Sequence, residues 1–101
     1  MKLTNEFNSI RRWASNRELH IKGDPKTQFI KLQEEVGELA KAILKSDEEE
    51  FKDAIGDCIV VLTNLAFISN IKVEDCINSA YDVISKRTGK MENGTFVKDE
   101  K

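Results

Sequence analysis

The stretch from Cys58 to Ile68 constrains the fold of this chain more than any other part of the sequence. Apart from Thr63 and Asn64, every residue in it is apolar, and it continues a helical pattern that begins at Phe51. A helix that is apolar on nearly all sides must be covered on all sides. A domain of 101 residues hides only roughly 60–65% of its unfolded surface. We therefore expect this helix to pack against a second subunit as well as its own chain.

Four helices are expected, because the sequence has only one proline and five glycines. Asp24-Pro25 is an N-cap followed by proline at the first helical position, and it predicts a second helix that runs to about Leu44. Ser46-Asp47 predicts the start of a third helix that ends near Ile68. The first helix is expected from Thr4 or Asn5 until it fades near residues 20–23, and the fourth over residues 73–86. The predicted fold is an all-α four-helix bundle in one domain, residues 1–101, with a helical core over about 4–87.

The C-terminal tail, residues 88–101, has a different pattern. Asn93-Gly94 is a two-residue turn signal, but the strands beside it would be very short. Two alternatives remain for this tail. It folds over the functional site of its own or a neighbouring subunit, or it is frayed.

Charge and apolar runs exclude several kinds of partner. The net charge of −2, from 16 basic and 18 acidic side chains, gives no basic footprint for nucleic acid. The longest uninterrupted apolar run, Cys58 to Leu62, is too short to span a membrane, and no apolar run before Trp13 indicates a secretory signal. Cys58 and Cys76 lack metal-type spacing and read as free, buried thiols in a reducing compartment, so we expect a cytoplasmic protein.

The near-neutral total hides an acidic centre. Residues 34–57 hold nine acids and three lysines, whereas residues 1–31 hold seven basic residues and three acids. On a helical wheel, the second helix carries one polar stripe along the edge of its buried face, and Glu34 points further outward. The third helix carries three acids on one face, at spacing i, i+3, i+7. The stripe consists of Gln28, Lys31, Glu35 and Glu38; the three acids are Glu50, Asp53 and Asp57.

Two facing rows of carboxylates repel one another unless a cation lies between them. Oxygen-only ligands suit Mg²⁺, and Mn²⁺ accepts similar sites. A di-iron site of the Glu-x-x-His type is excluded, since the single histidine, His20, is far from both clusters in sequence. The alternative is a solvated acidic face with a capping cluster, which is our interpretation of residues 47–49. Gly56 either permits a close helix approach beside Asp57 or is incidental.

The segments Lys31-Leu32-Gln33-Glu34-Glu35-Val36-Gly37-Glu38-Leu39-Ala40 and Asp53-Ala54-Ile55-Gly56-Asp57-Cys58-Ile59-Val60-Val61-Leu62 resemble the MazG family of all-α nucleoside triphosphate pyrophosphohydrolases. The resemblance implies Mg²⁺-dependent (Mn²⁺ possible) hydrolysis of a (d)NTP to the (d)NMP and pyrophosphate. By position, it implies that Glu35, Glu38 and Asp57 are metal ligands. Glu34 matches the first glutamate, and Glu34 or Glu35 would orient the attacking water. Many members carry a glutamate where this chain has Ala54, so Asp53 is the expected substitute ligand.

Further side chains are candidates for binding the substrate. Lys31, Lys86, Arg87 and Lys90 are candidates for the phosphates, and favourable charge at a helix C-terminus is an equal alternative for the last three. Trp13, Gln28 and Phe29 are candidates for a base pocket, although core packing is the more common role of such aromatic rings. Tyr81 and Asp82 occupy positions where similar proteins carry polar contacts. The tail resembles the ending of small phage and bacterial members of the family.

The predicted function is thus a metal-dependent nucleotide pyrophosphohydrolase that self-associates, as a tetramer rather than a dimer. Two alternatives are kept. One is a non-enzymatic or weakly active helical interaction protein with the same fold, which the departure at Ala54 favours. The other is a related enzyme that acts on a different phosphoanhydride, such as a modified nucleotide or an alarmone.

Overall fold

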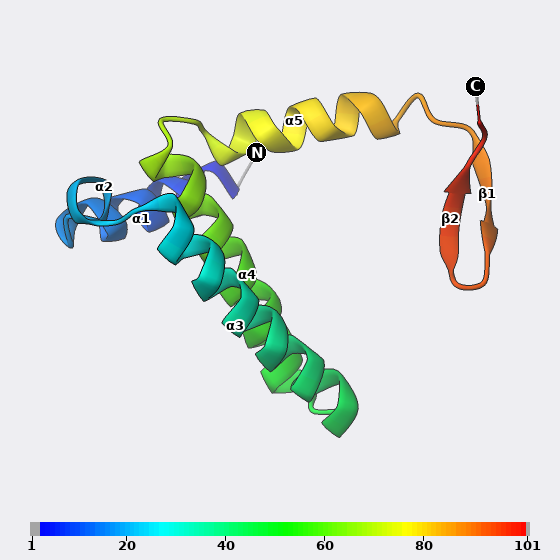
Figure 1. Cartoon of the computed structure of the whole chain (residues 1–101), viewed down its shortest axis with the longest axis horizontal. Helices are drawn as coiled ribbons and strands as arrows, with labels where there is room; N and C mark the ends of the chain where they lie inside the picture. Colours follow the sequence, from blue (N-terminus) through cyan, green and yellow to red (C-terminus); the bar gives the residue numbers. More distant parts are fainter. Residues whose placement is uncertain (1–2, 101) are drawn as a thin grey trace.

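The computed structural model describes residues 3–100. Within these residues the chain forms five helices followed by a two-stranded hairpin (Figure 1). The elements in chain order are α1 (Leu3–Asn16), α2 (Leu19–Lys22), α3 (Pro25–Lys45), α4 (Glu48–Ile68), α5 (Val73–Ile84), β1 (Gly89–Glu92) and β2 (Thr95–Lys98).

Helices α3 and α4 form a long pair that runs through the molecule (Figure 1). The Asp24 side chain caps α3 by accepting a 2.9 Å hydrogen bond from the Thr27 amide, and Pro25 takes the first helical position. Asp47 caps α4 by accepting a 3.0 Å bond from the Glu50 amide. Both predicted helix starts are therefore confirmed, and each cap satisfies an amide that the helix itself leaves without a partner.

The N-terminal helical region differs from the prediction. A single helix that fades near residues 20–23 was expected, but α1 ends at Asn16 and a separate short helix, α2, follows. Between them Glu18 adopts a left-handed conformation with φ of 61°. A residue in this region cannot continue a right-handed helix, so the chain changes direction here.

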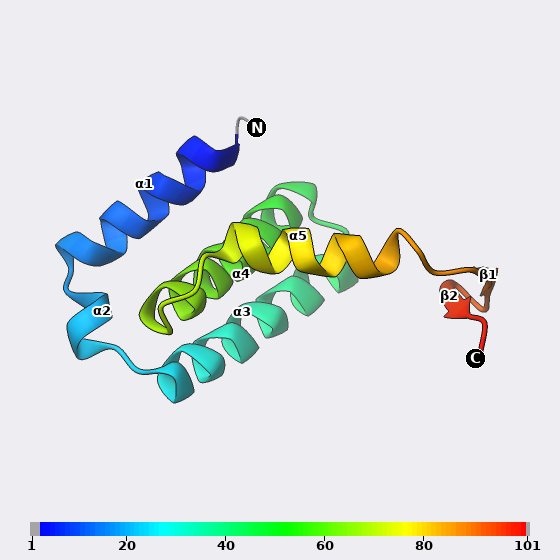
Figure 2. The same cartoon turned by 90° about the horizontal axis from the view of Figure 1, so that it is seen from above.

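A single copy of the chain does not form a closed four-helix bundle. The axis of α5 makes an angle of 107° with that of α4, so α5 leaves the α3–α4 pair as a projecting arm (Figures 1 and 2). The predominantly helical fold class is confirmed, whereas the closed bundle is not a property of the isolated chain. We attribute the difference to the short connection after Ile68, where Asn70 has a positive φ of 61°.

The tail adds a small sheet to the predicted helices. Strands β1 and β2 pair in antiparallel register, from Gly89 opposite Lys98 to Glu92 opposite Thr95. Asn93 and Gly94 have φ of 49° and 85°, as a two-residue hairpin turn requires. The turn signal is confirmed, and the described tail is neither frayed nor folded over the helices of its own chain (Figure 1). All residues of both strands are exposed.

Much apolar surface remains uncovered in the single chain. Ile59 and Leu62 of α4 are 43% and 42% exposed, and Leu44 at the end of α3 is 86% exposed. Cys58 is half-buried and Cys76 is exposed, so the prediction of two buried thiols is wrong for Cys76. Among the described helices none is by itself long and apolar enough to cross a membrane; α4 and α5 meet that criterion only when taken together across their bend.

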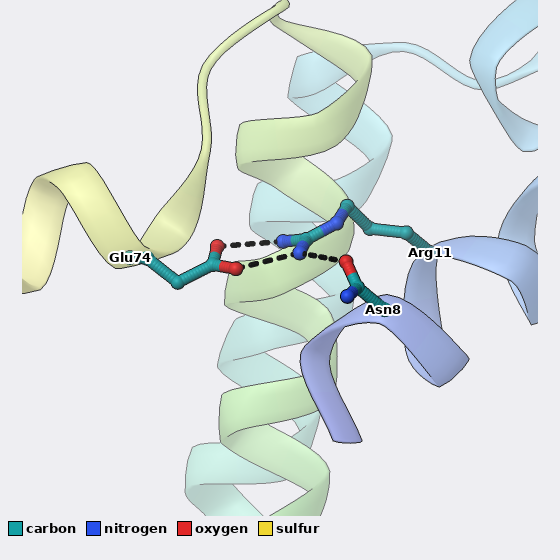
Figure 3. A network of polar contacts seen from close by, with 3 residues as sticks. All are labelled: Asn8, Arg11 and Glu74. Atoms are coloured by element: carbon teal, nitrogen blue, oxygen red, sulfur yellow. Dashed lines mark hydrogen bonds and ion pairs between the residues drawn. The ribbon is translucent and has the colours of Figure 1, made fainter. Parts of the chain in front are cut away.

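One ion pair ties the arm to the N-terminal helix (Figure 3). Arg11 of α1 donates two hydrogen bonds, of 2.7 and 2.6 Å, to the two carboxylate oxygens of Glu74 in α5. A third bond of 2.7 Å joins Arg11 to the Asn8 side chain. The side chains of Arg11 and Glu74 are only 15% and 20% exposed. We call this the Arg11–Glu74 clamp; its bidentate geometry fixes the start of α5.

Loss of the clamp is expected to destabilise the fold. The hydrogen bonds from Arg11 lower the pKa of Glu74 to about 2. A carboxyl whose pKa is lower in the folded than in the unfolded protein stabilises the folded state when the pH is above its unfolded pKa. This stabilisation is lost as the pH falls towards the pKa of the folded state. We expect Glu74→Gln to lower the free energy of unfolding at pH 7 by roughly 1–3 kcal/mol. Thermal unfolding followed by circular dichroism should show that the difference in melting temperature between Glu74→Gln and wild type becomes smaller as the pH falls from about 5 to 2.

The matched control for this prediction is Asp82→Asn. Its partner Lys86 lies 3.4 Å away, two residues beyond the end of the same helix, and both side chains are more than 70% exposed. Such exposed pairs contribute at most about 1 kcal/mol. Equal effects of the two substitutions would contradict the assignment of the clamp.

Candidate active site

The half of the α3–α4 pair nearest their connecting turn encloses an acidic cleft of about 330 Å³. Both helices contribute carboxylates to its walls. All four predicted metal-ligand residues line it together with one further glutamate and two lysines. The lining residues, which we call the acidic cleft, are Glu35, Glu38, Lys41, Lys45, Glu50, Asp53, Ala54 and Asp57.

Ala54, the position that departs from the family pattern, lies where the two helices approach each other. It is only 4% exposed, and Ala42 of α3 is 1% exposed. Small side chains at these positions allow close approach of the helix backbones. Asp53, one residue earlier, is exposed and lines the cleft. The structure therefore places a carboxylate in the cleft although the usual position carries alanine.

Lysines neutralise part of the acidic charge. Lys31 lies 3.4 Å from Glu35 and 3.8 Å from Glu34. Lys41 lies 3.6 Å from Glu38, and Lys45 lies 3.9 Å from Glu50. All these lysines are more than half exposed, so each pair is weak and screened by solvent. They can be displaced at little cost when a stronger cation arrives.

Asp57 shows the electrostatic strain of the cleft most directly. Burial raises its pKa, and the negative charges of Glu35 and Asp53 and a hydrogen bond with Glu35 raise it further; Lys31 acts in the opposite sense. The Glu35 side chain is only 16% exposed. Asp57 and Glu35 are therefore close carboxylates from opposite helices, of which Glu35 is largely buried and Asp57 remains exposed on the cleft side.

The donor set of the cleft fits a hard divalent cation. Its anionic donors are all carboxylates, which are the ligands that Mg²⁺ and Mn²⁺ prefer. In residues 3–100 no three acidic, histidine or cysteine side chains converge closely enough to hold an ion in their present rotamers. Glu35 and Glu38 are instead turned towards lysines of their own helix. Binding of an ion would thus require these side chains to turn away from their lysine partners.

Several predicted residues lie outside the cleft. Glu34 is 64% exposed and does not line it, which agrees with its outward position on the helical wheel. Trp13 is 48% exposed; it lines a separate hollow with Ser9, Ile10 and Val60, and the Arg17 guanidinium lies 4.2 Å from the centre of its ring. Neither core packing nor base stacking beside the cleft describes Trp13 in the single chain. Gln28 is half-buried and Phe29 is 56% exposed, and neither lines the cleft.

The predicted phosphate-binding cations of the tail are also remote from the cleft. Lys86 and Arg87 follow α5 and line a different hollow, and Lys90 in β1 pairs with Glu92 at 3.4 Å. Figure 1 shows the arm and the hairpin diverging from the α3–α4 pair, and in Figure 2 the hairpin lies beyond the end of the pair. The described chain therefore does not bring these cations to its own acidic cleft.

Three side chains that line the cleft were not predicted as site residues. Glu50 was recognised on the acidic face of its helix but not assigned to the site. Lys41 and Lys45 carried a signal in their spacing, since Lys41 follows Glu38 by three residues. Gly56 was a candidate for close helix approach, but a Cβ atom built there would meet nothing within 4 Å, so that interpretation is wrong for the isolated chain.

Comparison with known families agrees with the geometry. The family model of the MazG nucleotide pyrophosphohydrolase domain matches residues 24–92, which include the whole cleft. The chain belongs to the MazG family. The region that matches the MazG model begins at Asp24, which caps α3, and ends at Glu92, the last residue of β1. It therefore includes α5 and the first strand of the hairpin.

One curated relative is a phage protein of unknown role. It is the "Uncharacterized 18.2 kDa protein in rep-hol intergenic region" of Haemophilus phage HP1, 47% identical over 58 residues. The match covers 57% of this MazG-family chain and 36% of the phage protein, so the chain spans well under two thirds of that relative. No solved structure matches the chain.

The repulsion in the cleft leads to a stability prediction. The raised pKa of Asp57 means that its ionisation opposes folding as the pH rises above about 4, the usual value of an aspartate. We expect Asp57→Asn to raise the melting temperature at pH 7 when divalent ions are removed with a chelator. The control Glu49→Gln removes a favourable charge from the first turn of α4 and should lower the melting temperature slightly. A lower melting temperature for Asp57→Asn under these conditions would contradict the predicted repulsion.

Proposed function

We propose that this MazG-family chain is a metal-dependent nucleotide pyrophosphohydrolase that converts a (d)NTP to the (d)NMP and pyrophosphate. The observation that carries the proposal is the acidic cleft, where four carboxylates assigned from the motif line one cavity from two helices. The family assignment supports the reaction class. The substrate, the metal and the activity of this chain are part of the proposal.

Glu35, Glu38, Asp53 and Asp57 would hold the metal, with Mg²⁺ as the first candidate. A divalent cation in the cleft would neutralise charge on the triphosphate and so favour attack by water. The strain around Asp57 supports this assignment, because neighbouring carboxylates that repel one another in the free protein gain most from a bound cation. Strict dependence on a divalent ion follows, since the bare cleft repels a triphosphate.

Within the cleft, Glu35 is the better candidate for orienting water. Glu34 is 64% exposed and outside the cavity, whereas Glu35 is 16% exposed and faces Asp57. Water adds across the bond between the α- and β-phosphates, the bridging oxygen leaves with pyrophosphate, and the released proton passes to a carboxylate. A partly desolvated carboxylate that is not fully engaged as a ligand suits this role.

Lys31 has a position from which it can change partners. Its ammonium group contacts Glu35 and Glu34 at 3.4 and 3.8 Å, and its side chain is 52% exposed. Cation binding by Glu35 would release Lys31, which could then contact a phosphate. Gln28, one turn earlier on the same stripe, is the nearest predicted polar contact for the rest of the substrate.

The lysine pairs also favour the second candidate function, a helical interaction protein without catalysis. In that case Lys31, Lys41 and Lys45 would neutralise the cleft permanently. A screen of the canonical NTPs and dNTPs with Mg²⁺ or Mn²⁺ distinguishes the two, with monophosphate and pyrophosphate as the measured products. No turnover at high protein concentration with any substrate would leave only the non-enzymatic candidate or an untested phosphoanhydride.

Glu38→Gln is expected to reduce turnover at least about 100-fold, because it removes one anionic ligand while keeping the size of the side chain. Its circular dichroism spectrum should match that of wild type, since Glu38 is 62% exposed and makes only a weak pair with Lys41. Glu48→Gln, in the exposed capping turn of the same acidic block, is the matched control and should retain activity. Full activity of Glu38→Gln would refute the ligand assignment.

Cation binding itself can be measured without a substrate. Mg²⁺ that binds only the folded protein raises the melting temperature by mass action. We expect the increase for wild type and for Glu48→Gln, and a much smaller one for Glu38→Gln. An equal increase in all three proteins would indicate nonspecific ion binding.

A further inference from the structure

The hairpin formed by β1 and β2 takes no part in the acidic cleft of its own chain, and much of its apolar surface is uncovered. All residues of both strands are exposed, and Figure 1 shows the hairpin beyond the end of α5. Met91 is 66% exposed and Phe96 is 47% exposed. A two-stranded hairpin alone is only marginally stable in water, and further strands or a packed helix stabilise it. The match to the MazG model ends at Glu92, so β2 lies outside it and the family assignment does not account for the hairpin.

The outer edge of β1 offers backbone groups that can bond to another strand. Hydrogen-bonded and non-bonded residue pairs alternate along an antiparallel ladder. The Asp99 amide donates a 2.8 Å hydrogen bond to the Thr88 carbonyl. Counting from this pair in steps of two, the backbone groups of Lys90 and Glu92 face β2, whereas those of Met91 point to the outer edge. Within the described residues no strand pairs with this edge.

The side chains of β1 are divided between an apolar and a charged face of the hairpin. Residues opposite each other in the ladder share a face, and Met91 lies opposite Phe96. The Phe96 ring also covers Gly89, since a Cβ atom built there would lie 2.7 Å from the Cζ atom of the ring. On the other face, Lys90 and Glu92 lie two residues apart and form an ion pair of 3.4 Å. β1 therefore carries one basic and one acidic side chain symmetrically about Met91.

This symmetry allows β1 to pair with a second β1 in one antiparallel register. When the two Met91 residues lie opposite each other, their outward amide and carbonyl groups can bond, and each Lys90 lies opposite the Glu92 of the other strand. A shift of two residues places Lys90 opposite Lys90 or Glu92 opposite Glu92, and like charges directly opposite each other destabilise a strand pair. A shift of one residue moves the apolar side chains of the two strands to opposite faces of the sheet. Charge therefore selects the register centred on Met91.

The charges of β1 also determine which partner the edge can accept. Charged side chains on an edge strand normally prevent association with other strands. The order lysine, methionine, glutamate removes this barrier for a strand that presents the reverse order of charges, and a second β1 in antiparallel orientation is such a strand. β2 has no comparable pattern, because Lys98 is its only charged residue and no register of two β2 strands pairs opposite charges. The charge pattern thus favours one occupant, a second copy of this chain.

We propose that β1 pairs with β1 of a second copy of this chain, antiparallel and centred on Met91, so that two hairpins form one four-stranded sheet. The Met91 and Phe96 side chains of both copies then lie on a single apolar face of this sheet. The added strands supply the neighbours that a lone hairpin lacks. The contact uses none of the helices and no residue of the acidic cleft, so it goes beyond the proposed function and does not depend on turnover.

Disulfide formation tests the contact. Cys58 and Cys76 are replaced by alanine, and the Met91→Cys variant of this chain is treated with oxidised glutathione. Bonded residue pairs have Cα atoms about 5.5 Å apart, which a disulfide can span, so we expect a covalent dimer joined through position 91 on a non-reducing gel. Thr95→Cys is the matched control, because β2 of one copy lies three strand spacings, or roughly 14 Å, from β2 of the other. Absence of the dimer with Met91→Cys, or equally fast dimer formation with Thr95→Cys, would overturn the proposal.

Charge reversal in the same Met91→Cys chain tests the register. Lys90→Glu or Glu92→Lys alone places like charges opposite each other twice, and we expect each to slow dimer formation roughly five-fold or more. An equal mixture of the two variants restores opposite charges, so its dimers should contain one chain of each kind, which mass spectrometry distinguishes. Lys26→Glu reverses an exposed charge on α3 and should leave the rate of dimer formation unchanged. If the single reversals at β1 have no effect, or if the chains combine at random in the mixture, the proposed pairing is wrong.

Discussion

The contact between α3 and α4 determines the position of every acid in the cleft. Ala42 and Ala54 are buried in this region, and their small side chains let the two backbones approach. Side-chain caps at Asp24 and Asp47 start both helices at defined residues. Since each helix begins at a fixed residue, the carboxylates that follow at three- and four-residue spacing face across the pair in a fixed register. The cleft is therefore a property of two regular helices, which suits the metal site proposed for it.

The acids of this cleft are arranged at a cost to the folded state. Asp57 stands where the polar half of α4 gives way to its apolar half, so burial and two neighbouring carboxylates act on the same group. Three exposed lysines offset part of the repulsion through weak pairs. Strong permanent partners would neutralise the cleft and compete with a metal. Weak partners keep the charge available while limiting the loss of stability, and this balance is more consistent with a binding site than with an ordinary solvated face.

The sequence predicted the elements whose signals are local. The starts of α3 and α4 were predictable because Asp24-Pro25 and Ser46-Asp47 act on adjacent amides, and the four assigned carboxylates followed from helical periodicity. The break at Glu18 was not predictable, because a left-handed glutamate has no local sequence signal. Nor was the Arg11–Glu74 clamp, whose partners are 63 residues apart. The direction of α5 depends on that clamp and on the connection at Asn70, so the single chain shows neither the expected four-helix bundle nor the tail cations beside its own cleft.

The two halves of α4 line different cavities. Its first half contributes acids to the cleft, and its second half contributes Leu62, Leu65 and Ala66 to a separate apolar groove of about 410 Å³ between α4 and α5. Because one continuous 21-residue helix carries both, a partner seated in the groove acquires a fixed position relative to the cleft. Self-association would then do more than cover apolar surface. It would place the charged groups of a partner at a defined distance from the carboxylates of the cleft.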